Sequence, residues 1–177
     1  MKFRVEDIPE GGREETFTQD ENWLDDRLTG ERERSFHFVG PISVRLVLSR
    51  SGKIVTVKSR IEARVDWVCA RCLEPFSRTL KSEYTISLKP RPDSLPPEEV
   101  ELRREDLETE FYVGEEVHLS PSVQDQVLLA IPQKALCREE CRGLCPKCGK
   151  NLNREACHCQ DEAVDSRLEP LKNFRVN

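Results

Sequence analysis

The stretch VTVKSRIEARVDW, residues 55–67, decides the fold, because apolar and polar residues alternate along its whole length. Successive side chains of a β-strand point to opposite faces of the sheet. The pattern therefore predicts a long strand with one buried and one solvent-exposed face. The residues that share the predicted buried face are Val55, Val57, Ile61, Ala63, Val65 and Trp67, and those of the exposed face are Thr56, Lys58, Arg60, Glu62, Arg64 and Asp66.

The same alternation occurs on both sides of this strand. In PISVRLVLS, residues 41–49, the apolar residues Ile42, Val44, Leu46 and Leu48 recur at every second position, and further along the chain Phe76, Leu80, Tyr84, Ile86 and Leu88 do so. Short polar connections lie at 49–53 and 69–75. We therefore predict a three-stranded antiparallel meander over residues 36–88.

Residues 120–132, SPSVQDQVLLAIP, predict an amphipathic helix with Ser120 as N-cap, Pro121 at its first position and Pro132 at its end. Its apolar stripe, Val123, Val127, Leu128 and Ile131, is expected to pack on the sheet. The preceding residues, EFYVGEEVHL, predict a hairpin that turns at Gly114 and Glu115. The fold class is therefore α+β: an antiparallel meander packed by a helix, with a small C-terminal cysteine-rich zinc knuckle.

Composition divides the chain into three parts. Residues 1–35 are polar, and we expect a short strand at MKFRVEDI followed by an irregular excursion. Residues 36–132 form the predicted core of sheet and helix, with a proline-rich, charged and mobile loop at 89–108. Residues 133–177 form a cysteine-rich tail, in which 163–174 predict a short helix.

The eight cysteines point to metal binding. The chain has no long apolar run and no apolar signal segment at its start, so we expect a cytoplasmic protein with no membrane contact. Disulfides are rare in the cytosol, and cysteine pairs there more often hold a metal. A redox role for the Cys-x2-Cys pairs is disfavoured, because neither pair opens a helix after a strand.

Spacing groups the cysteines into candidate zinc sites. The first site comprises Cys145, Cys148, Cys157 and Cys159, because CPKCG has the form of a zinc knuckle and a short polar loop can return the last pair to it. A second site would combine Cys69 and Cys72, at a predicted turn, with Cys137 and Cys141. The alternatives are a single zinc that uses Cys141 or draws on both regions, and two free thiols at the strand end. One or two structural Zn²⁺ ions are thus expected.

Charge suggests where a partner would bind. The formal net charge is -5, so any contact with nucleic acid must use a local basic patch. The cysteine segment offers five such cations: Arg138, Arg142, Lys147, Lys150 and Arg154. They either offset the negative charge of zinc thiolates or contact RNA phosphates. No phosphate loop, nucleophile elbow or metalloprotease motif occurs, so we predict no enzyme, no catalytic residue and no small-molecule substrate.

Four segments resemble the YceD family of large ribosomal RNA subunit accumulation proteins: CARCLEPF, GEEVHLSPSVQDQVLLAIPQKALC, CRGLCPKCGKNLN and DSRLEPLKNF. The resemblance covers residues 40–177 in order and, more loosely, the opening MKFRVEDI. It implies a bacterial cytosolic or plastid protein that supports accumulation of large-subunit ribosomal RNA. It carries over no catalytic residue, and because some members of the family have fewer tail cysteines, it implies that the metal stabilises rather than acts.

These observations favour a non-enzymatic ribosome-biogenesis factor that supports synthesis or accumulation of 23S ribosomal RNA. Its expected partner is a large-subunit ribosomal RNA precursor, through the basic cysteine segment, or a basic ribosomal protein, through the acidic N-terminal half. The alternatives are a zinc-dependent enzyme acting on RNA and a redox-sensing zinc switch.

Overall fold

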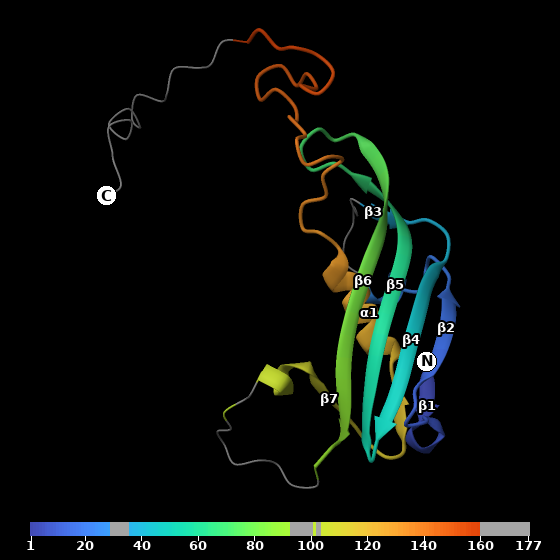
Figure 1. The fold of residues 1–177 in the computed structure, drawn as a ribbon. Coiled ribbons are helices and arrows are strands. Elements are labelled where there is room, and N and C mark those ends of the chain that lie inside the picture. Colours follow the sequence, from blue (N-terminus) through green and yellow to red (C-terminus); the bar gives the residue numbers. More distant parts are fainter. Residues whose placement is uncertain (29–35, 93–100, 102–103, 160–177) are drawn as a thin grey trace.

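The computed structural model describes residues 1–28, 36–92, 101 and 104–159 (Figure 1). The elements follow in the order β1 (Lys2–Arg4), η1 (Val5–Asp7), β2 (Arg13–Gln19), η2 (Asp25–Arg27), β3 (Phe36–Phe38), β4 (Ile42–Ser51), β5 (Ile54–Val68), β6 (Pro75–Pro90), η3 (Arg104–Glu108), β7 (Thr109–Tyr112), β8 (Glu116–His118) and α1 (Ser120–Ala130). Here η denotes a short 3₁₀ helix. The helix predicted at 163–174 lies outside the described residues.

One long, twisted sheet dominates the molecule. Its strand order is β2-β4-β5-β6-β7, and β3 also pairs with β5. All these pairings are antiparallel except that of β6 with β7. The predicted β4–β5–β6 meander is therefore confirmed, with turns at Gly52 and at residues 69–74.

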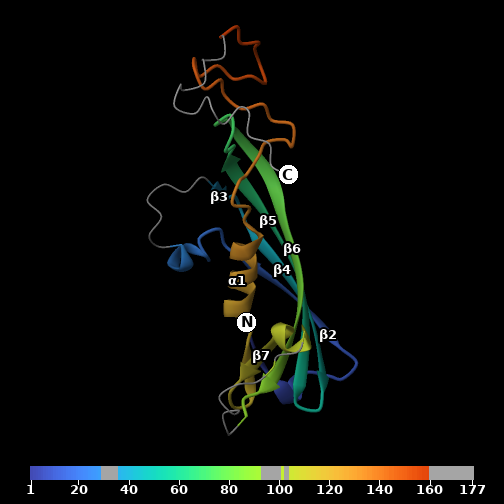
Figure 2. The same ribbon diagram turned by 90° about the vertical axis from the view of Figure 1, so that its left-hand side faces the viewer.

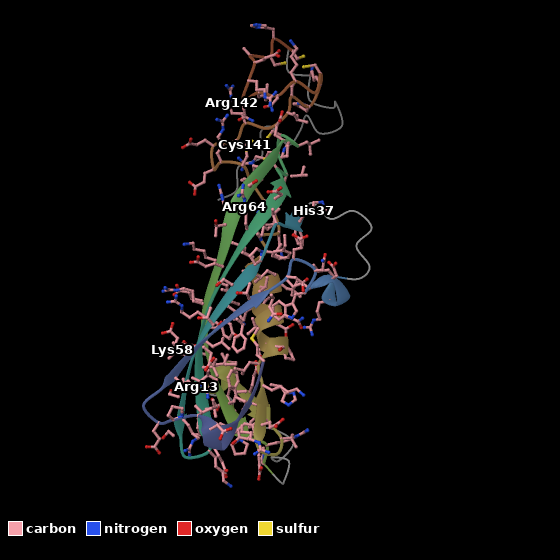
Figure 3. All side chains as sticks on the ribbon, turned by 90° about the vertical axis from the view of Figure 1, so that its right-hand side faces the viewer. Arg13, His37, Lys58, Arg64, Cys141 and Arg142 are labelled. Carbon is pink, nitrogen blue, oxygen red and sulfur yellow. The ribbon has the colours of Figure 1, made fainter. Side chains whose placement is uncertain are left out.

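The two faces of the sheet differ as the alternation predicts. The inward side chains of β4 and β5, from Ile42 to Trp67, are almost all fully buried and form one apolar core with Ile86 and Leu88 of β6. Many of the outward side chains are charged and pair across strands, as in the ion pairs Arg60–Glu83 at 2.7 Å and Lys81–Glu62 at 3.3 Å. Figure 3 shows Lys58 on this exposed side, away from α1.

Helix α1 covers the inward face (Figure 2), where Val123 and Val127 are fully buried. The predicted helix is confirmed within one residue at its start, but its N-cap is Leu119 instead of Ser120. The Ser120 hydroxyl instead accepts a hydrogen bond from the Met1 nitrogen at 2.6 Å. None of the helices in the described part of the chain has the length and apolarity that a membrane span requires.

Two expectations about strands were wrong. The excursion after residue 8 contains β2, which pairs with β4 along its whole length. Its sequence, REETFTQ, gives little signal because an edge strand with a single aromatic on its inward side needs few apolar residues. The hairpin predicted at 110–119 does not form: β7 joins β6 in parallel, whereas β8 pairs with β1. Gly114 does turn the chain, at φ +77°, but it sends the two strands to different sheets.

The loop predicted at 89–108 is partly ordered. Strand β6 continues to Pro90, and η3 begins at Arg104. Residues 93–100 and 102–103 lie outside the described residues. The division into three parts at residues 35 and 132 stays a prediction.

The fold brings the two cysteine-bearing regions together. Strands β5 and β6 extend beyond the rest of the sheet at one end, where the turn at 69–74 carries Cys69 and Cys72 (Figure 1). After α1, the chain returns along β6 to this turn and then forms the remaining cysteine segment beyond it. We refer to residues 69–74 and 135–159 together as the tip.

Candidate metal centres

The turn between β5 and β6 is a tight knuckle that presents two thiols. The Cys69 N–H donates to the Glu74 carbonyl at 3.0 Å, and the Leu73 N–H donates to the Cys69 carbonyl at 2.9 Å. Leu73 has a φ of +58°, a conformation that costs a leucine about 1 kcal/mol or more. The turn is thus held in a shape that local propensity alone does not favour.

The chain after α1 is fixed to this turn by backbone hydrogen bonds. The Ala70 N–H donates to the Ala135 carbonyl at 2.8 Å, and the Leu144 N–H donates to the Arg71 carbonyl at 3.1 Å. The Arg71 guanidinium also donates to the Cys141 carbonyl at 2.9 Å. These hydrogen bonds of Ala70 and Arg71 therefore place Cys137 and Cys141 opposite Cys69 and Cys72.

These four residues, Cys69, Cys72, Cys137 and Cys141, form what we call the inner cysteine set. Their sulfur atoms all lie within 4.8 Å of one another. The Cys69–Cys141 and Cys72–Cys137 sulfur distances are both 3.8 Å. Two thiolates on one tetrahedral zinc are separated by about 3.8 Å, given a Zn–S bond of about 2.3 Å. Geometry and donor type both fit a four-sulfur metal site.

The outer cysteine set comprises Cys145, Cys148, Cys157 and Cys159, whose sulfurs also lie within 4.8 Å of one another. Its knuckle is closed by the Cys145 N–H, which donates to the Lys150 carbonyl at 2.8 Å, and by the Gly149 N–H, which donates to the Cys145 carbonyl at 2.9 Å. Gly149 has a φ of +71°, which favours glycine at this position. The Cys157 sulfur lies 3.3 Å from that of Cys145 and 3.5 Å from that of Cys148.

The two sets differ in exposure. Cys69, Cys72 and Cys141 of the inner set are buried, whereas Cys148 and Cys159 of the outer set are exposed. The structure thus groups the eight cysteines into the first site and the possible second site that sequence analysis named, and the inner set is the more buried of the two, since only Cys145 of the outer set is buried. The inner set draws on both the turn and the tail, and no single group that mixes members of the two sets is found among the described residues.

Each set contains at least one thiol whose pKa lies below its ordinary value: Cys69 and Cys141 in the inner set and Cys145 in the outer set. In the inner set, burial raises the pKa of Cys69, but the backbone N–H groups of Cys137, Cys72 and Arg71 outweigh it and bring that pKa to about 6. Burial raises the pKa of Cys72 to about 12. In the outer set, the backbone N–H groups of Cys148 and Lys147 lower the pKa of Cys145 to about 6. A metal would therefore meet at least one thiolate in each set and displace protons from the remaining thiols.

Asn153 connects the two sets. Its side-chain amide donates to the Cys141 sulfur at 3.3 Å, and its carbonyl oxygen accepts from the Arg142 N–H at 2.8 Å. Asn153 belongs to the loop of the outer set, so an outer residue here orients an inner ligand. Sequence reasoning did not identify Asn153, although an asparagine in a polar loop between metal-ligand pairs is a usual source of such hydrogen bonds.

Gly143 and Glu74 complete the contact between the turn at 69–74 and the segment after α1, which we call the junction. Gly143 has a φ of +74°, and a Cβ atom there would lie 3.0 Å from the Arg71 carbonyl oxygen. The Glu74 carboxylate accepts from the Asn151 amide at 3.2 Å and from the Arg154 guanidinium at 2.9 Å. The segment after α1 is therefore joined to the turn by Gly143, Asn151 and Glu74, which sequence analysis did not single out, and by Arg154, which it named as a candidate RNA contact.

All the cations predicted to contact RNA lie exposed on the tip: Arg138, Arg142, Lys147, Lys150 and Arg154. Figure 3 labels Arg142 beside Cys141. Lys150 lies 3.5 Å from the Glu155 carboxylate, and Arg154 pairs with Glu74. The structure thus gathers these side chains around the cysteine sets, and part of their charge is already balanced by carboxylates.

Comparison with known proteins identifies the family. Residues 57–175 match the family model described as "Large ribosomal RNA subunit accumulation protein YceD". No solved structure matches the chain. The family's description refers to accumulation of an RNA and names no reaction.

Individual relatives come from plants and bacteria. An Arabidopsis thaliana protein named "Large ribosomal RNA subunit accumulation protein YCED homolog 1, chloroplastic" is 26% identical over 76% of this chain and 49% of its own length, so the chain spans about half of that relative. An uncharacterized protein of Mycobacterium tuberculosis is 31% identical over 80% of this chain and 72% of its own length. The Haemophilus influenzae protein named YceD is 34% identical over 45% of this chain and 44% of its own length. The chain therefore belongs to the YceD family of large ribosomal RNA subunit accumulation proteins, a family related to ribosome biogenesis.

Proposed function

We propose that this protein is a non-enzymatic ribosome-biogenesis factor of the cytoplasm that supports synthesis or accumulation of 23S ribosomal RNA. The observation that carries the proposal is the tip: five exposed cations surround two cysteine sets at one end of a chain with a net charge of -5. The proposed partner is a precursor of large-subunit ribosomal RNA, and the alternative partner is a basic ribosomal protein. Family membership supports the process, and the tip supports the place of contact.

Each cysteine set is proposed to hold one structural Zn²⁺. Four sulfur donors at these separations suit zinc, and zinc is the usual metal of closed four-cysteine sites. A catalytic zinc keeps one position for water, whereas four thiolates fill all four positions. The donor sets therefore favour a role in holding the tip together over a zinc-dependent reaction on RNA.

Zinc would also change the charge of the tip. A zinc ion with four thiolates carries a net charge of about -2, so two such sites need several nearby cations. Lys150 and Arg154 are engaged by Glu155 and Glu74. We therefore expect Arg138 and Arg142 to contribute more to phosphate binding than Lys150 and Arg154 do.

Binding of fragments of 23S ribosomal RNA tests the contact. The zinc-loaded chain should bind such fragments with an affinity that falls as salt rises, because phosphate contacts release counterions. Arg138→Ala with Arg142→Ala should weaken binding uniformly across sequences and reduce the salt slope by about 2, about 1 for each lost contact. The matched control is Lys58→Ala with Arg64→Ala, which removes two exposed cations from the sheet and leaves the tip intact.

The outcome also separates the two partners. Binding only to a basic ribosomal protein, with no salt-dependent RNA binding, would assign the role to protein recognition. In cells, loss of the gene should lower 23S relative to 16S ribosomal RNA. Unchanged RNA ratios and subunit profiles in the deletion strain would contradict the proposed function.

A further inference from the structure

Strand β6 has a free edge. One edge pairs with β5 from Pro75 to Leu88, and the other pairs with β7 only from Ser87 to Pro90. Over Pro75–Ile86 that second edge has no strand partner within the ranges that the structure describes. Such an edge presents backbone N–H and C=O groups that another strand can pair with.

A hollow of about 540 Å³ runs along the part of this edge nearest the tip. It is lined by four consecutive residues of β6, Arg78–Lys81. Consecutive side chains of a strand point to opposite faces, so the hollow must lie on the backbone edge to touch all four. The facing wall is the chain after α1, including Pro132 and Leu136.

A second hollow, of about 910 Å³, adjoins the next part of this edge and extends over the exposed sheet face as far as Arg45 of β4 and Glu14 of β2. It is lined by the next run of consecutive residues, Glu83–Ile86, together with Leu107 and Glu108 of η3, Gln126 of α1 and side chains of the exposed sheet face. Ser82 alone separates the two runs. We call the combined feature along Arg78–Ile86 the β6 trough.

The chemistry of the trough indicates what fits. The hollow nearest the tip has an apolar lining that includes Trp67, Phe76 and Leu80. Its charged side chains are Arg78, Lys81, Lys134 and Glu139. Cations thus outnumber carboxylates there, although the chain as a whole is acidic. The Lys81 ammonium lies 3.3 Å from Glu62, and the Arg78 guanidinium lies over the Phe76 ring, 5.8 Å from its centroid.

We propose that the β6 trough binds an extended segment of another protein, with alternate apolar and acidic residues, which adds a strand to the free edge of β6. The backbone edge supplies hydrogen bonds, the apolar lining accepts every second side chain, and the cations of the hollow nearest the tip accept the carboxylates between them. Strand β7 already shows that this edge accepts a strand, at Ser87–Pro90. A phosphate backbone would use the cations but not the row of N–H and C=O groups, so the geometry favours a peptide over RNA.

Two synthetic peptides test the proposal on the full, zinc-loaded chain. The first is a blocked nonapeptide that alternates valine and glutamate, and the second has lysine in place of glutamate. We expect saturable binding of the glutamate peptide, with at least ten-fold weaker binding of the lysine peptide. The readouts are Trp67 fluorescence, measured in a Trp23→Phe background, and slower amide hydrogen exchange over residues 78–86.

Charge reversal supplies the matched variants. Arg78→Glu with Lys134→Glu should weaken the glutamate peptide at least ten-fold and strengthen the lysine peptide. Lys53→Glu, in the turn between β4 and β5 outside the lining of both hollows, should change neither. Retained affinity in the double variant would overturn the proposed role of the cations.

The other outcomes are equally decisive. The proposal fails if neither peptide binds up to about 1 mM, the weak end of specific recognition. It also fails if a short RNA oligonucleotide competes for the same amides. Protection, without any peptide, of those amides of residues 78–86 that face away from β5 would assign the trough to a second copy, if sedimentation shows a dimer, or to the chain itself, if it shows a monomer. None of these results bears on RNA binding by the tip, so the two proposals can fail separately.

Discussion

The sheet and the tip are built by different chemistry, although β5 and β6 run through both. In the sheet, aliphatic side chains from Ile42 to Leu88 are buried in one continuous core. In the tip, the buried cluster is Cys69, Cys72 and Cys141, with Phe76, Leu136, Cys137 and Leu144 packed around it. The sheet can be stabilised by removing apolar surface from water, whereas the tip has too little such surface to do the same.

This difference indicates that the sheet and the tip are stabilised independently, the sheet by its apolar core and the tip by other interactions. An apolar core of this size supplies its own driving force, and the backbone hydrogen bonds of the sheet come with it. The tip instead joins backbone hydrogen bonds, a few buried polar contacts and eight thiols. If each set holds zinc, folding of the tip should depend on the metal, and folding of the sheet should not.

Removal of metal should produce the largest effect. Structural zinc contributes about 10–16 kcal/mol of apparent binding free energy that is also folding free energy. A strong chelator should therefore abolish amide protection over residues 137–159 and leave the residues of β4, β5 and β6 protected. Hydrogen exchange with zinc analysis measures both. Cooperative loss of the whole sheet would show that tip and sheet form one folding unit.

Single ligand replacements should then separate the sets. Cys145→Ser should cost one zinc per chain and disorder the outer loop, while the inner set stays loaded. Cys69→Ser should disorder both sets, because the chain that carries the outer set is fixed to the turn at Ala70 and Arg71. Zinc stoichiometry of the two variants decides this. Equal loss of one zinc in each would mean that the sets fold independently.

A core truncation provides the opposite test. Leu46 is fully buried, so Leu46→Ala should lower the free energy of unfolding by about 2–5 kcal/mol. Val47→Ala, on the neighbouring and partly exposed position, should change it far less. Denaturant unfolding measures the loss, and zinc content should stay the same in both variants. Loss of zinc in Leu46→Ala would show that the tip depends on core packing.

The sheet was the easier part to predict because its signal is repeated. Each inward residue from Val55 to Trp67 adds to one period-two pattern, and β5 pairs with both neighbours as that pattern requires. Strand β2 was missed because a short edge strand needs only one inward apolar contact, which Phe17 supplies. The parallel pairing of β7 was missed because it depends on how the chain returns from the end of β6, which local pattern does not encode.

The tip was predictable only at the level of residue type. Cysteine spacing indicated the outer set because a knuckle is a local structure, whereas the inner set was one of several alternatives because its two halves lie far apart in the sequence. The contacts that join them are long-range: Arg71 reaches Cys141, Glu74 reaches Arg154, and Gly143 lies against Arg71. No periodicity links these residues in the sequence, so only the folded chain reveals them.

Gly143 offers a smaller test at the junction. Gly143→Ala should destabilise the tip, because the new methyl group would lie 3.0 Å from the Arg71 carbonyl at a φ of +74°. Gly40→Ala is the matched control: its φ is +73°, but no atom lies within 4 Å of the added carbon. Both variants carry about 1–2 kcal/mol of backbone strain, so the difference between them reports the contact alone. Equal effects on zinc affinity and unfolding would remove Gly143 from the junction.

The smallest expected effect concerns Asn153, and it tests whether the outer set influences zinc affinity at the inner set. Its hydrogen bond to the Cys141 sulfur, at 3.3 Å, should stabilise the ionised ligand by about 0.5–1.5 kcal/mol, or roughly 2–13-fold in zinc affinity. Asn153→Ala should weaken zinc binding at the inner set by this factor, measured by competition with a chromophoric chelator. Asn153→Asp keeps an oxygen to accept from the Arg142 N–H, but it cannot donate to the sulfur, so it should not restore the affinity.

Coupling between the zinc affinities of the two sets requires that the outer set hold Asn153 in place. Cys148→Ser should therefore also weaken zinc at the inner set, because the loop that carries Asn153 loses its own metal. In an Asn153→Ala background, the same Cys148→Ser change should have no further effect on the inner set, since the connecting hydrogen bond is already gone. Additive losses in this double-mutant cycle would mean that the sets are neighbours without coupling. A non-additive result would make Asn153 the residue through which the exposed set controls the buried one.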